Sequence, residues 1–428
     1  MKRKIITFSI ILLFICLLAC KVGAEEALTW QDCLKEAAKN NPDLISSGEA
    51  VKQKEAAKTI TASGLYPQID ADLDASTTKK TTVTSGSSTT ATTDSYSYGL
   101  SATQLIFDGR KTANEIKAAS QDIKAAQESY RFTSSEVRYN LRSAFVNLLK
   151  EQELIKVIEE IVKIRRNSLM LISLRYESGL EHKGALLTAE ANVAQANFEL
   201  SQAKRDLELM QVKLNKEMGR EEFEPIIVKG DFEISDTVKE KPDFDELINN
   251  NPSVLQAIAK KNSASFDIKS AYANFSPQLS GTAGTSKSGS KWPAKGKQWN
   301  LGLGISMPIF EGGLRVAQVS QAQSAYRQAQ ADERSVIDSA IVSLEQAWVE
   351  LQDAVETVGV QQKSLEAAVE RSNIAEAQYS AGFIDFDSWT IIENNLVTVK
   401  KSFLNAQANV LLAEANWVQA KGETLEYE

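Results

Sequence analysis

Few side chains in this sequence are suited to chemistry. Among 428 residues there is one histidine, His182, and there are three cysteines, of which only Cys33 lies beyond residue 20. A zinc or copper site needs several nitrogen or sulfur ligands. The sequence also has no phosphate-binding glycine loop and no nucleophile elbow. We therefore predict no metal, no cofactor and no enzymatic activity.

The best candidates for a functional site lie beside two glycine-containing breaks. YESGL at 176–180 recurs as YSAGF at 379–383, each between long helical patterns. Glycine permits the positive φ that a helix reversal needs, so we predict helix turns at both places. Simple helix capping is the alternative for each glycine. Carboxylates follow the breaks: Glu181, Asp385 and Asp387.

The N-terminus and the charge limit where the protein works. Basic residues precede an apolar run, residues 5–19, and small residues follow up to Ala24. This pattern predicts a secretory signal peptide over residues 1–24. A retained membrane anchor is the alternative, and a lipoprotein-like Leu-Leu-Ala-Cys leaves lipidation of Cys20 open. With 48 basic and 56 acidic residues the net charge is −8, and we predict no nucleic-acid partner.

Internal repeats show that the chain is a duplication. Short motifs recur in the same order: NNPDL and NNPSV at 40 and 250, LYPQI and FSPQL at 65 and 275, and IFDG and IFEG at 106 and 309. We predict a first repeat over residues 25–220, a linker over 221–249 and a second repeat over 250–428.

Each repeat reads as helix, strand, polar loop, strand, very long helix, glycine break and second long helix. In the first repeat we predict a helix from about Trp30 to Ala62, capped by Thr29. A Thr/Ser-rich loop is predicted from Thr77 to Asp94. The segment from Lys111 to Arg175 has no proline and predicts one helix of roughly 100 Å.

Apolar residues recur every seven positions along the long helices, which predicts coiled-coil seams. Rows of alanine beside them indicate close packing on a second face, as in the wall of a tube. An ordinary antiparallel coiled coil is the alternative. The apolar rows are Leu141, Leu148, Ile155, Val162, Leu169 and Tyr176; Leu344, Leu351, Val358, Leu365 and Tyr379, with the polar Ser372 between the last two; Leu186, Val193, Leu200, Leu207 and Leu214; and Trp389, Leu396, Phe403, Val410 and Trp417. The alanine rows are Ala189, Ala196 and Ala203, and Ala406, Ala413 and Ala420.

The predicted strands alternate apolar and polar residues, as in SYSYGLSATQLIFDG at 95–109 and QWNLGLGISMPIFEG at 298–312. Two short hairpins with an exposed apolar face are unstable in water, whereas strands of about ten residues cross a bilayer at a tilt. Lipid tolerates no open sheet edge, so several chains must share one barrel. A soluble sandwich is the alternative. The predicted lipid-facing residues are Tyr96, Tyr98, Leu100, Trp299, Leu301 and Leu303.

With these features the chain resembles the TolC-like outer-membrane efflux family. The most specific matches are the IFDG and IFEG joints and the two Tyr-x-x-Gly breaks. The resemblance implies a mainly α fold in a Gram-negative bacterium, with long helices forming an α-barrel in the periplasm. It also implies a homotrimer with one transmembrane β-barrel in outer-membrane lipid, four strands per chain and twelve in all. Such channels are passive exit ducts that work with a periplasmic adaptor (membrane fusion) protein and an inner-membrane RND or ABC transporter.

The resemblance assigns roles at the helix turns. It implies adaptor docking at the periplasmic tip, on Tyr176, Gly179, Leu180, Gly382 and Phe383. It also implies a constriction, for which Tyr379 occupies the family's tyrosine position. The other constriction positions differ, being Ile384, Ala185, Ser388 and Ile391. We predict that Asp385 or Asp387 supplies an acidic ring, although Asp387 is equally suited to cap a helix beginning near Ser388.

A periplasmic coiled-coil adaptor or scaffold is the alternative function. Adaptors have one helical hairpin between β-rich halves, whereas here two hairpins of each kind recur. Drug, protein and metabolite export are all compatible with the sequence. One histidine and five methionines argue against a channel specialised for soft metals.

Overall fold

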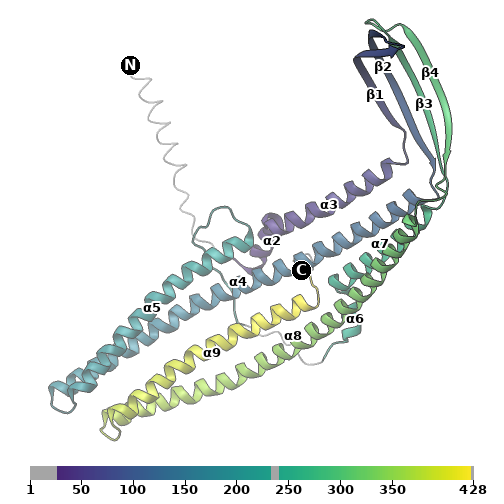
Figure 1. The fold of residues 1–428 in the computed structure, drawn as a ribbon. Coiled ribbons are helices and arrows are strands. Elements are labelled where there is room, and N and C mark those ends of the chain that lie inside the picture. The colour runs from purple at the N-terminus through teal and green to yellow at the C-terminus, as the bar shows by residue number, and fades with distance from the viewer. Residues whose placement is uncertain (1–26, 233–240, 426–428) are drawn as a thin grey trace, which may run out of the picture. The chain divides into compact units, whose positions relative to one another are not determined.

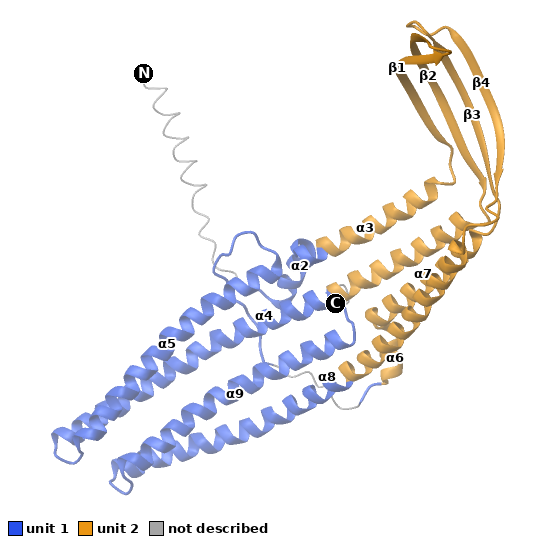
Figure 2. Ribbon diagram, viewed as in Figure 1, with its two compact units in different colours: residues 1–44, 134–242, 345–428 blue, residues 45–133, 243–344 orange. Residues whose placement is uncertain are grey.

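The computed structural model describes residues 27–232 and 241–425 (Figure 1). The predicted signal peptide and Cys20 lie outside the described residues. The chain divides into two compact units (Figure 2). Unit 1 consists of residues 1–44, 134–242 and 345–428, and unit 2 of residues 45–133 and 243–344.

The described elements form two series in the same order. The first series is α2 (Trp30–Asn40), α3 (Pro42–Ser63), β1 (Gln68–Thr84), β2 (Ser87–Phe107), α4 (Lys111–Glu177) and α5 (Lys183–Met218). The second is α6 (Phe244–Asn250), α7 (Pro252–Ala273), β3 (Gln278–Gly289), β4 (Gly296–Ser306), α8 (Leu314–Ser380) and α9 (Phe386–Ala420). Helices α4 and α8 have 67 residues each. The predicted long helices and hairpins are therefore present, and α6 begins inside the predicted linker.

The first predicted helix is two helices, so the prediction of one helix from Trp30 to Ala62 was wrong. Thr29 does cap α2, because its side chain accepts a hydrogen bond from the Asp32 backbone N–H. The break follows from Asn41 and Pro42. Proline has no N–H to continue a helix but suits the first position of a new one. The Asn41 side chain accepts from the Asp43 N–H at 3.0 Å and donates to the Glu217 carbonyl at 2.9 Å.

The predicted polar loop from Thr77 to Asp94 is also corrected. Its residues continue the β1–β2 ladder as far as the pair Thr84↔Ser87. Ser85 and Gly86 form the two-residue turn, with φ of 49° and 85°. Positive φ at both positions is the geometry of a tight hairpin turn, and threonine favours strands. The Ser-Gly pair between threonine-rich runs was the signal for a longer hairpin.

The four strands form one antiparallel sheet in the order β1-β2-β3-β4 (Figure 1). Residues paired across strands share a face, so the register defines one apolar and one polar face. The apolar face carries Ile69, Ala71, Leu73, Tyr98, Leu100, Ala102, Leu279, Ala283, Trp299, Leu301, Leu303 and Ile305. The polar face carries Asp70, Asp72, Asp74, Ser97, Ser101, Thr282, Ser286, Gln298 and Asn300. Of the predicted lipid-facing residues, Leu100, Trp299, Leu301 and Leu303 are exposed, and Tyr96 and Tyr98 are half-buried.

Unit 1 is held together by the facing sides of α4, α5, α8 and α9. The predicted seam residues Leu141 and Leu148 of α4 are fully buried, and Leu351 of α8 is buried too. On α5 the buried row consists of the alanines: Ala196 and Ala203 pack against Ile158 and Val162 of α4. The alanines thus share one cluster with seam residues such as Val162 and Leu200, and most leucines of the seven-residue row on α5 are half-buried. No helix within residues 27–232 and 241–425 is long and apolar enough to cross a membrane.

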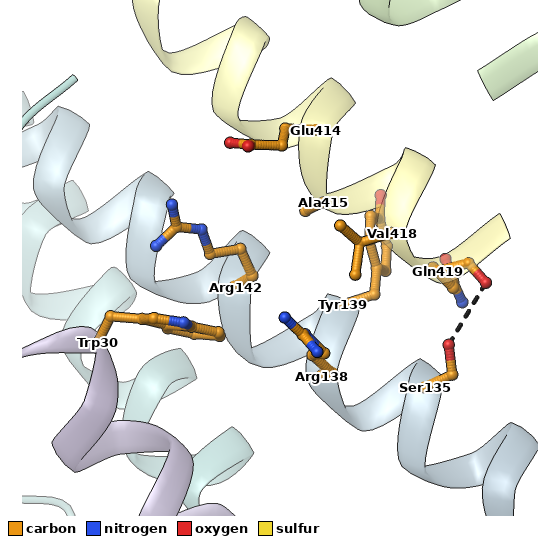
Figure 3. A pocket seen from close by; sticks show the side chains of 9 residues that line it. All are labelled: Trp30, Ser135, Arg138, Tyr139, Arg142, Glu414, Ala415, Val418 and Gln419. Carbon is orange, nitrogen blue, oxygen red and sulfur yellow. Dashed lines mark hydrogen bonds between the residues drawn. The ribbon is translucent and has the colours of Figure 1, made fainter. Parts of the chain in front are cut away.

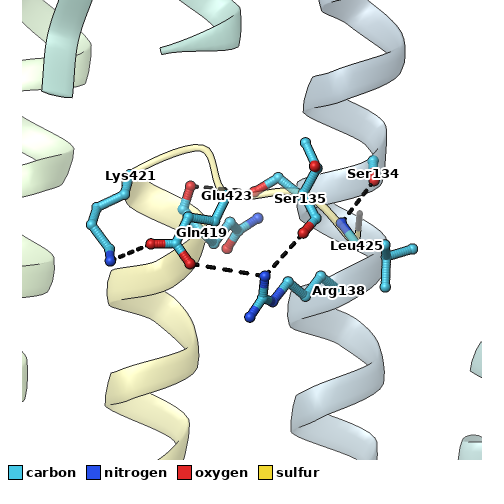
Figure 4. Close-up of polar contacts among 8 residues, drawn as sticks. Ser134, Ser135, Arg138, Gln419, Lys421, Glu423 and Leu425 are labelled. Atoms are coloured by element: carbon cyan, nitrogen blue, oxygen red, sulfur yellow. Dashed lines mark hydrogen bonds and ion pairs between the residues drawn. The ribbon is translucent and has the colours of Figure 1, made fainter. Parts of the chain in front are cut away.

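The end of α9 and the segment after it are fixed to α4 by polar contacts (Figure 4). Arg138 donates to the Thr424 carbonyl at 2.9 Å and lies 3.8 Å from the Glu423 carboxylate. The Leu425 N–H donates to the Ser134 hydroxyl at 3.1 Å. These contacts join residues almost 300 positions apart in the chain and leave the C-terminal segment packed on the helices.

A pocket of about 160 Å³ lies beside these contacts, between α2, α4 and α9 (Figure 3). The Arg142 guanidinium stacks over the Trp30 ring at 4.9 Å, and Trp30 meets Phe145 edge to face at 5.8 Å. Ligand sites for drug-sized molecules have about 300–1,000 Å³. This pocket is therefore a local packing feature and too small to hold such a molecule.

Cys33 on α2 should be inert while the protein is folded. Its thiol is fully buried, and this burial raises the pKa of Cys33 to about 12. Because only the thiolate reacts, we expect iodoacetamide to modify Cys33 roughly a thousandfold more slowly than a free thiol. Mass spectrometry of the mature protein, before and after denaturant, measures this rate. Cys33→Ser controls for modification elsewhere, and rapid labelling of the native protein would contradict the expectation.

Candidate functional site at the helix turns

The two long helices of unit 1 each end in the same turn. The Leu180 N–H donates to the Arg175 carbonyl at 2.8 Å, and the Phe383 N–H donates to the Gln378 carbonyl at 2.8 Å. These bonds, with a glycine in the left-handed region, define a Schellman turn. Gly179 has φ of 70° and Gly382 has φ of 80°, which confirms the predicted reversals.

The residues that follow the glycines are presented to solvent. Leu180 is 67% exposed and Phe383 is 82% exposed. Both are apolar and directly follow the glycine of a hydrogen-bonded turn. Tyr176 on α4 is 38% exposed. The five residues predicted for adaptor docking therefore form exposed tips in the described structure.

Tyr379 lies on the inner side of the second turn and is only 1% exposed. Its ring stacks on Trp389 of α9 at 4.5 Å with an angle of 12° between the planes. Its hydroxyl donates to a Glu181 carboxylate oxygen at 2.7 Å. Burial raises the pKa of Tyr379, and the adjacent Glu181 carboxylate raises it further. The phenol therefore stays protonated and donates its hydrogen bond at any physiological pH.

Arg175 covers the other face of this tyrosine. Its guanidinium lies 4.8 Å from the centre of the Tyr379 ring and donates to the Tyr379 carbonyl at 3.4 Å. Tyr379 thus joins α4, the turn before α5, α8 and α9. Tyr379 and Glu181 were predicted site residues, whereas Trp389 was predicted only as a member of an apolar row and Arg175 was not predicted at all. A basic residue in the last helical turn and the seven-residue row through Trp389 were the available signals.

The two acidic residues after Gly382 have different environments. Asp385 is the cap of α9, and its carboxylate accepts a hydrogen bond from the Ser388 N–H at 2.8 Å. The hydrogen bonds with Ser388 hold the pKa of Asp385 below its usual value. The helix begins at Phe386, so the suggestion that Asp387 caps a helix near Ser388 was wrong. Asp387 is an exposed residue of the first helical turn.

His182 caps α5 at the other turn. Its Nδ1 accepts a hydrogen bond from the Ala185 N–H at 3.1 Å, and its Nε2 lies 3.8 Å from the Glu181 carboxylate. Among the described residues no group of three or more histidine, cysteine, aspartate or glutamate side chains could hold a metal ion. The turn chemistry is thus hydrogen bonding and charge.

A buried ion pair connects α4 and α9 farther from the turns. Arg165 and Glu393 are both buried, and the Arg165 guanidinium donates to the Glu393 carboxylate and to the Asn394 amide oxygen. The Ser168 hydroxyl donates to the second Glu393 oxygen at 2.6 Å. Both carboxylate oxygens and the guanidinium therefore have partners, as buried charges require. No sequence motif marks these residues as partners.

Comparison with known proteins decides the family. The family model described as "Outer membrane efflux protein" matches residues 33–220 and 244–423, which is most of the chain. The chain belongs to the outer membrane efflux protein family. The predicted resemblance is confirmed, and the protein is an outer-membrane efflux channel.

Individual relatives of this efflux channel are distant but extensive. The outer membrane efflux protein BepC of Brucella suis biovar 1 is 22% identical over 409 residues, covering 94% of this chain and 86% of BepC. TolC of Escherichia coli K12 is 24% identical over 347 residues, covering 76% of this chain and 69% of TolC. A membrane protein of Pseudomonas aeruginosa has the same fold, with a TM-score of 0.82 at 18% identity, covering 91% of this chain and 93% of that one.

The positions that the resemblance assigned to a constriction have the following environments in this efflux channel. Ala185, at an expected aspartate position, is fully buried beside Tyr379. Ile384, at the expected arginine position, packs against the same cluster. Ile391 is exposed, and the Ser388 N–H is used by the Asp385 cap. The cationic residue that contacts Tyr379 in this structure is Arg175 of α4.

Proposed function

We propose that three copies of this efflux channel form one continuous exit duct, with their sheets closed into a shared barrel in the outer membrane. The amphipathic sheet is the observation that carries this proposal. Its strands β1 and β4 each have only one partner strand within the described chain. A hydrocarbon environment requires every backbone group to be hydrogen-bonded, so β4 of one copy would pair with β1 of the next.

A soluble scaffold or adaptor fits this sheet poorly. Trp299, Leu301 and Leu303 lie side by side on one face and are exposed in the single chain. Water would make such a face a site of aggregation, whereas lipid makes it favourable. The protein extracted from membranes in mild detergent should migrate as an oligomer unless heated, and should form channels in planar bilayers. A water-soluble monomer without conductance would refute the proposal.

The exposed turns are the proposed contact for a periplasmic adaptor protein. Leu180 and Phe383 present apolar side chains on turns whose backbone is fixed by hydrogen bonds. Large apolar side chains exposed on adjacent turns are typical of a protein interaction site. The inner-membrane RND or ABC transporter behind the adaptor would supply the energy, since a passive duct has no chemistry of its own.

The proposed constriction is acidic, with Asp385 and Asp387 repeated around the three-fold axis. Rings of carboxylates in a narrow bore select cations and bind divalent ions. Tyr379 is buried in the single chain, so its part in the constriction would be to hold the second turn against Glu181.

Neutral variants test the constriction without removing the helix cap. Asp385→Asn keeps an oxygen for the Ser388 N–H, and Asp387→Asn leaves the cap untouched. We expect each to weaken divalent-cation block of single channels by roughly tenfold, because three charges leave the bore. Glu208→Gln, on α5 about 40 Å along the helix axis from the turn, is the control and should behave like the parent. Unchanged conductance and block in both aspartate variants would refute the acidic ring.

A further inference from the structure

The second hairpin is strongly basic at its turn. Residues 278–306 contain no aspartate or glutamate but four lysines, Lys287, Lys291, Lys295 and Lys297. The first hairpin carries Asp70, Asp72 and Asp74 at the start of β1, on the polar face. The hairpin turns and the helix-connected ends of the sheet therefore differ in charge.

Two of these lysines oppose each other directly. Lys287 of β3 is the cross-strand partner of Lys297 of β4. Opposed side chains on a sheet have Cβ atoms about 4.5–5.5 Å apart, and like charges there are destabilising. Neither lysine forms an ion pair with any described carboxylate. The two positive charges therefore repel each other, and an anion held between the two ammonium groups would offset this repulsion.

The register places this pair on the apolar face. Alternate residues of a strand share a face, so Lys297 is on the side of Trp299 and Leu301. Lys287 is likewise level with Tyr98 of β2, and its ammonium lies 5.7 Å from the centre of the Tyr98 ring. A lysine pair that attracted cargo inside a duct would need to face the polar side. These two lysines lie on the apolar face, which is the face proposed to meet lipid.

Aromatic side chains mark the depth of the pair. Tyr96 and Tyr98 contact Trp292 of the hairpin loop, with ring centres 6.3 and 5.6 Å apart. Trp299 follows Lys297 on the same face. Aromatic residues gather where hydrocarbon meets lipid headgroups, and lysines beside them extend their ammonium groups toward the headgroups. Phosphate groups of membrane lipids lie at this depth.

We propose that Lys287 and Lys297 form a docking site for a phosphate group of an anionic lipid in the outer leaflet. The phosphate lies between the two ammonium groups and removes their mutual repulsion. Exposed Lys291 and Lys295 in the adjoining loop add positive charge. The inference rests on the proposed duct, because it requires the apolar face of the sheet to contact lipid and the hairpin turns to face the exterior.

Lipid binding to the purified full-length oligomer in neutral detergent tests the site. Native mass spectrometry would follow a titration with diphosphorylated lipid A and with the same lipid after dephosphorylation. Each lysine near a membrane surface contributes a factor of about five. We therefore expect Lys287→Gln/Lys297→Gln to bind the phosphorylated lipid about thirtyfold more weakly. Lys79→Gln/Lys80→Gln removes the same charge from the same sheet, beyond the part paired with β3, and should bind normally.

Thermal unfolding gives a second readout, because the substitution should shift the unfolding midpoint in opposite directions without and with lipid A. In neutral detergent alone Lys297→Gln should raise the midpoint, because it removes the repulsion, whereas with lipid A present it should lower the midpoint relative to the parent. The inference would be overturned if the parent and the Lys287/Lys297 double variant bound lipid A with equal affinity, or if the Lys79/Lys80 control lost as much affinity as the double variant. It would also be overturned if the parent bound dephosphorylated lipid as tightly as lipid A, or if equimolar inorganic phosphate displaced the lipid. Planar-bilayer conductance of the same parent preparation separates the two proposals, since a conducting channel without the lipid site refutes only this one.

Discussion

Glu393→Ala is expected to destabilise the helices of unit 1 by about 3–5 kcal/mol, because it leaves the buried Arg165 guanidinium without its carboxylate. Both side chains are buried, and Ser168 and Asn394 complete the network. Hydrogen exchange of α4 and α9 around these residues measures the local free energy of opening. The midpoint of unfolding in guanidinium chloride, measured on the purified protein, gives the effect on global stability.

Two controls test whether the loss of stability comes from a buried charge left without a partner. Arg165→Met/Glu393→Leu removes both charges and fills the space, so it should recover most of the stability. Glu160→Ala breaks the ion pair between Glu160 and Lys400, whose charged atoms are 2.7 Å apart. Because Glu160 is largely exposed, this variant should lower the free energy of unfolding by less than about 1 kcal/mol. A Glu393→Ala effect no larger than that of Glu160→Ala would contradict the prediction.

Leu301→Arg is expected to prevent or strongly reduce assembly in the outer membrane. Leu301 lies at the middle of β4 on the apolar face, and an arginine on the lipid side near the bilayer midplane costs about 2–4 kcal/mol. The amount of heat-sensitive oligomer in outer-membrane fractions measures assembly. Urea unfolding in lipid measures the free energy.

The neighbouring residue provides the matched control. Asn300 is next to Leu301 in β4 but faces the polar side, so Asn300→Arg introduces the same charge at the same depth. We expect it to assemble normally, with a change in conductance only. Equal loss of assembly in both variants would mean that the two faces of the sheet do not have different surroundings.

Local patterns were enough to predict the elements of this protein. The period of two in 298–306 and the period of seven in α4 and α8 are set by side-chain direction within one element, and both predictions are confirmed. Gly179 and Gly382 were recognisable because a reversal needs positive φ. The two wrong predictions about elements also concerned local signals. The Asn41-Pro42 helix break and the Ser85-Gly86 hairpin turn can both be recognised in the sequence, but the longer helical and polar patterns around them were given more weight.

The contacts between elements were decided only by the tertiary structure. Tyr176 and Tyr379 occupy the same position of the repeated motif, yet one is 38% exposed and the other 1%. Arg165 and Glu393 are 228 residues apart, and nothing in either local sequence marks them as partners. Side-chain periodicity determines which face of a helix is apolar, but which of several similar faces is covered depends on the packing free energy of helices that are distant in the chain.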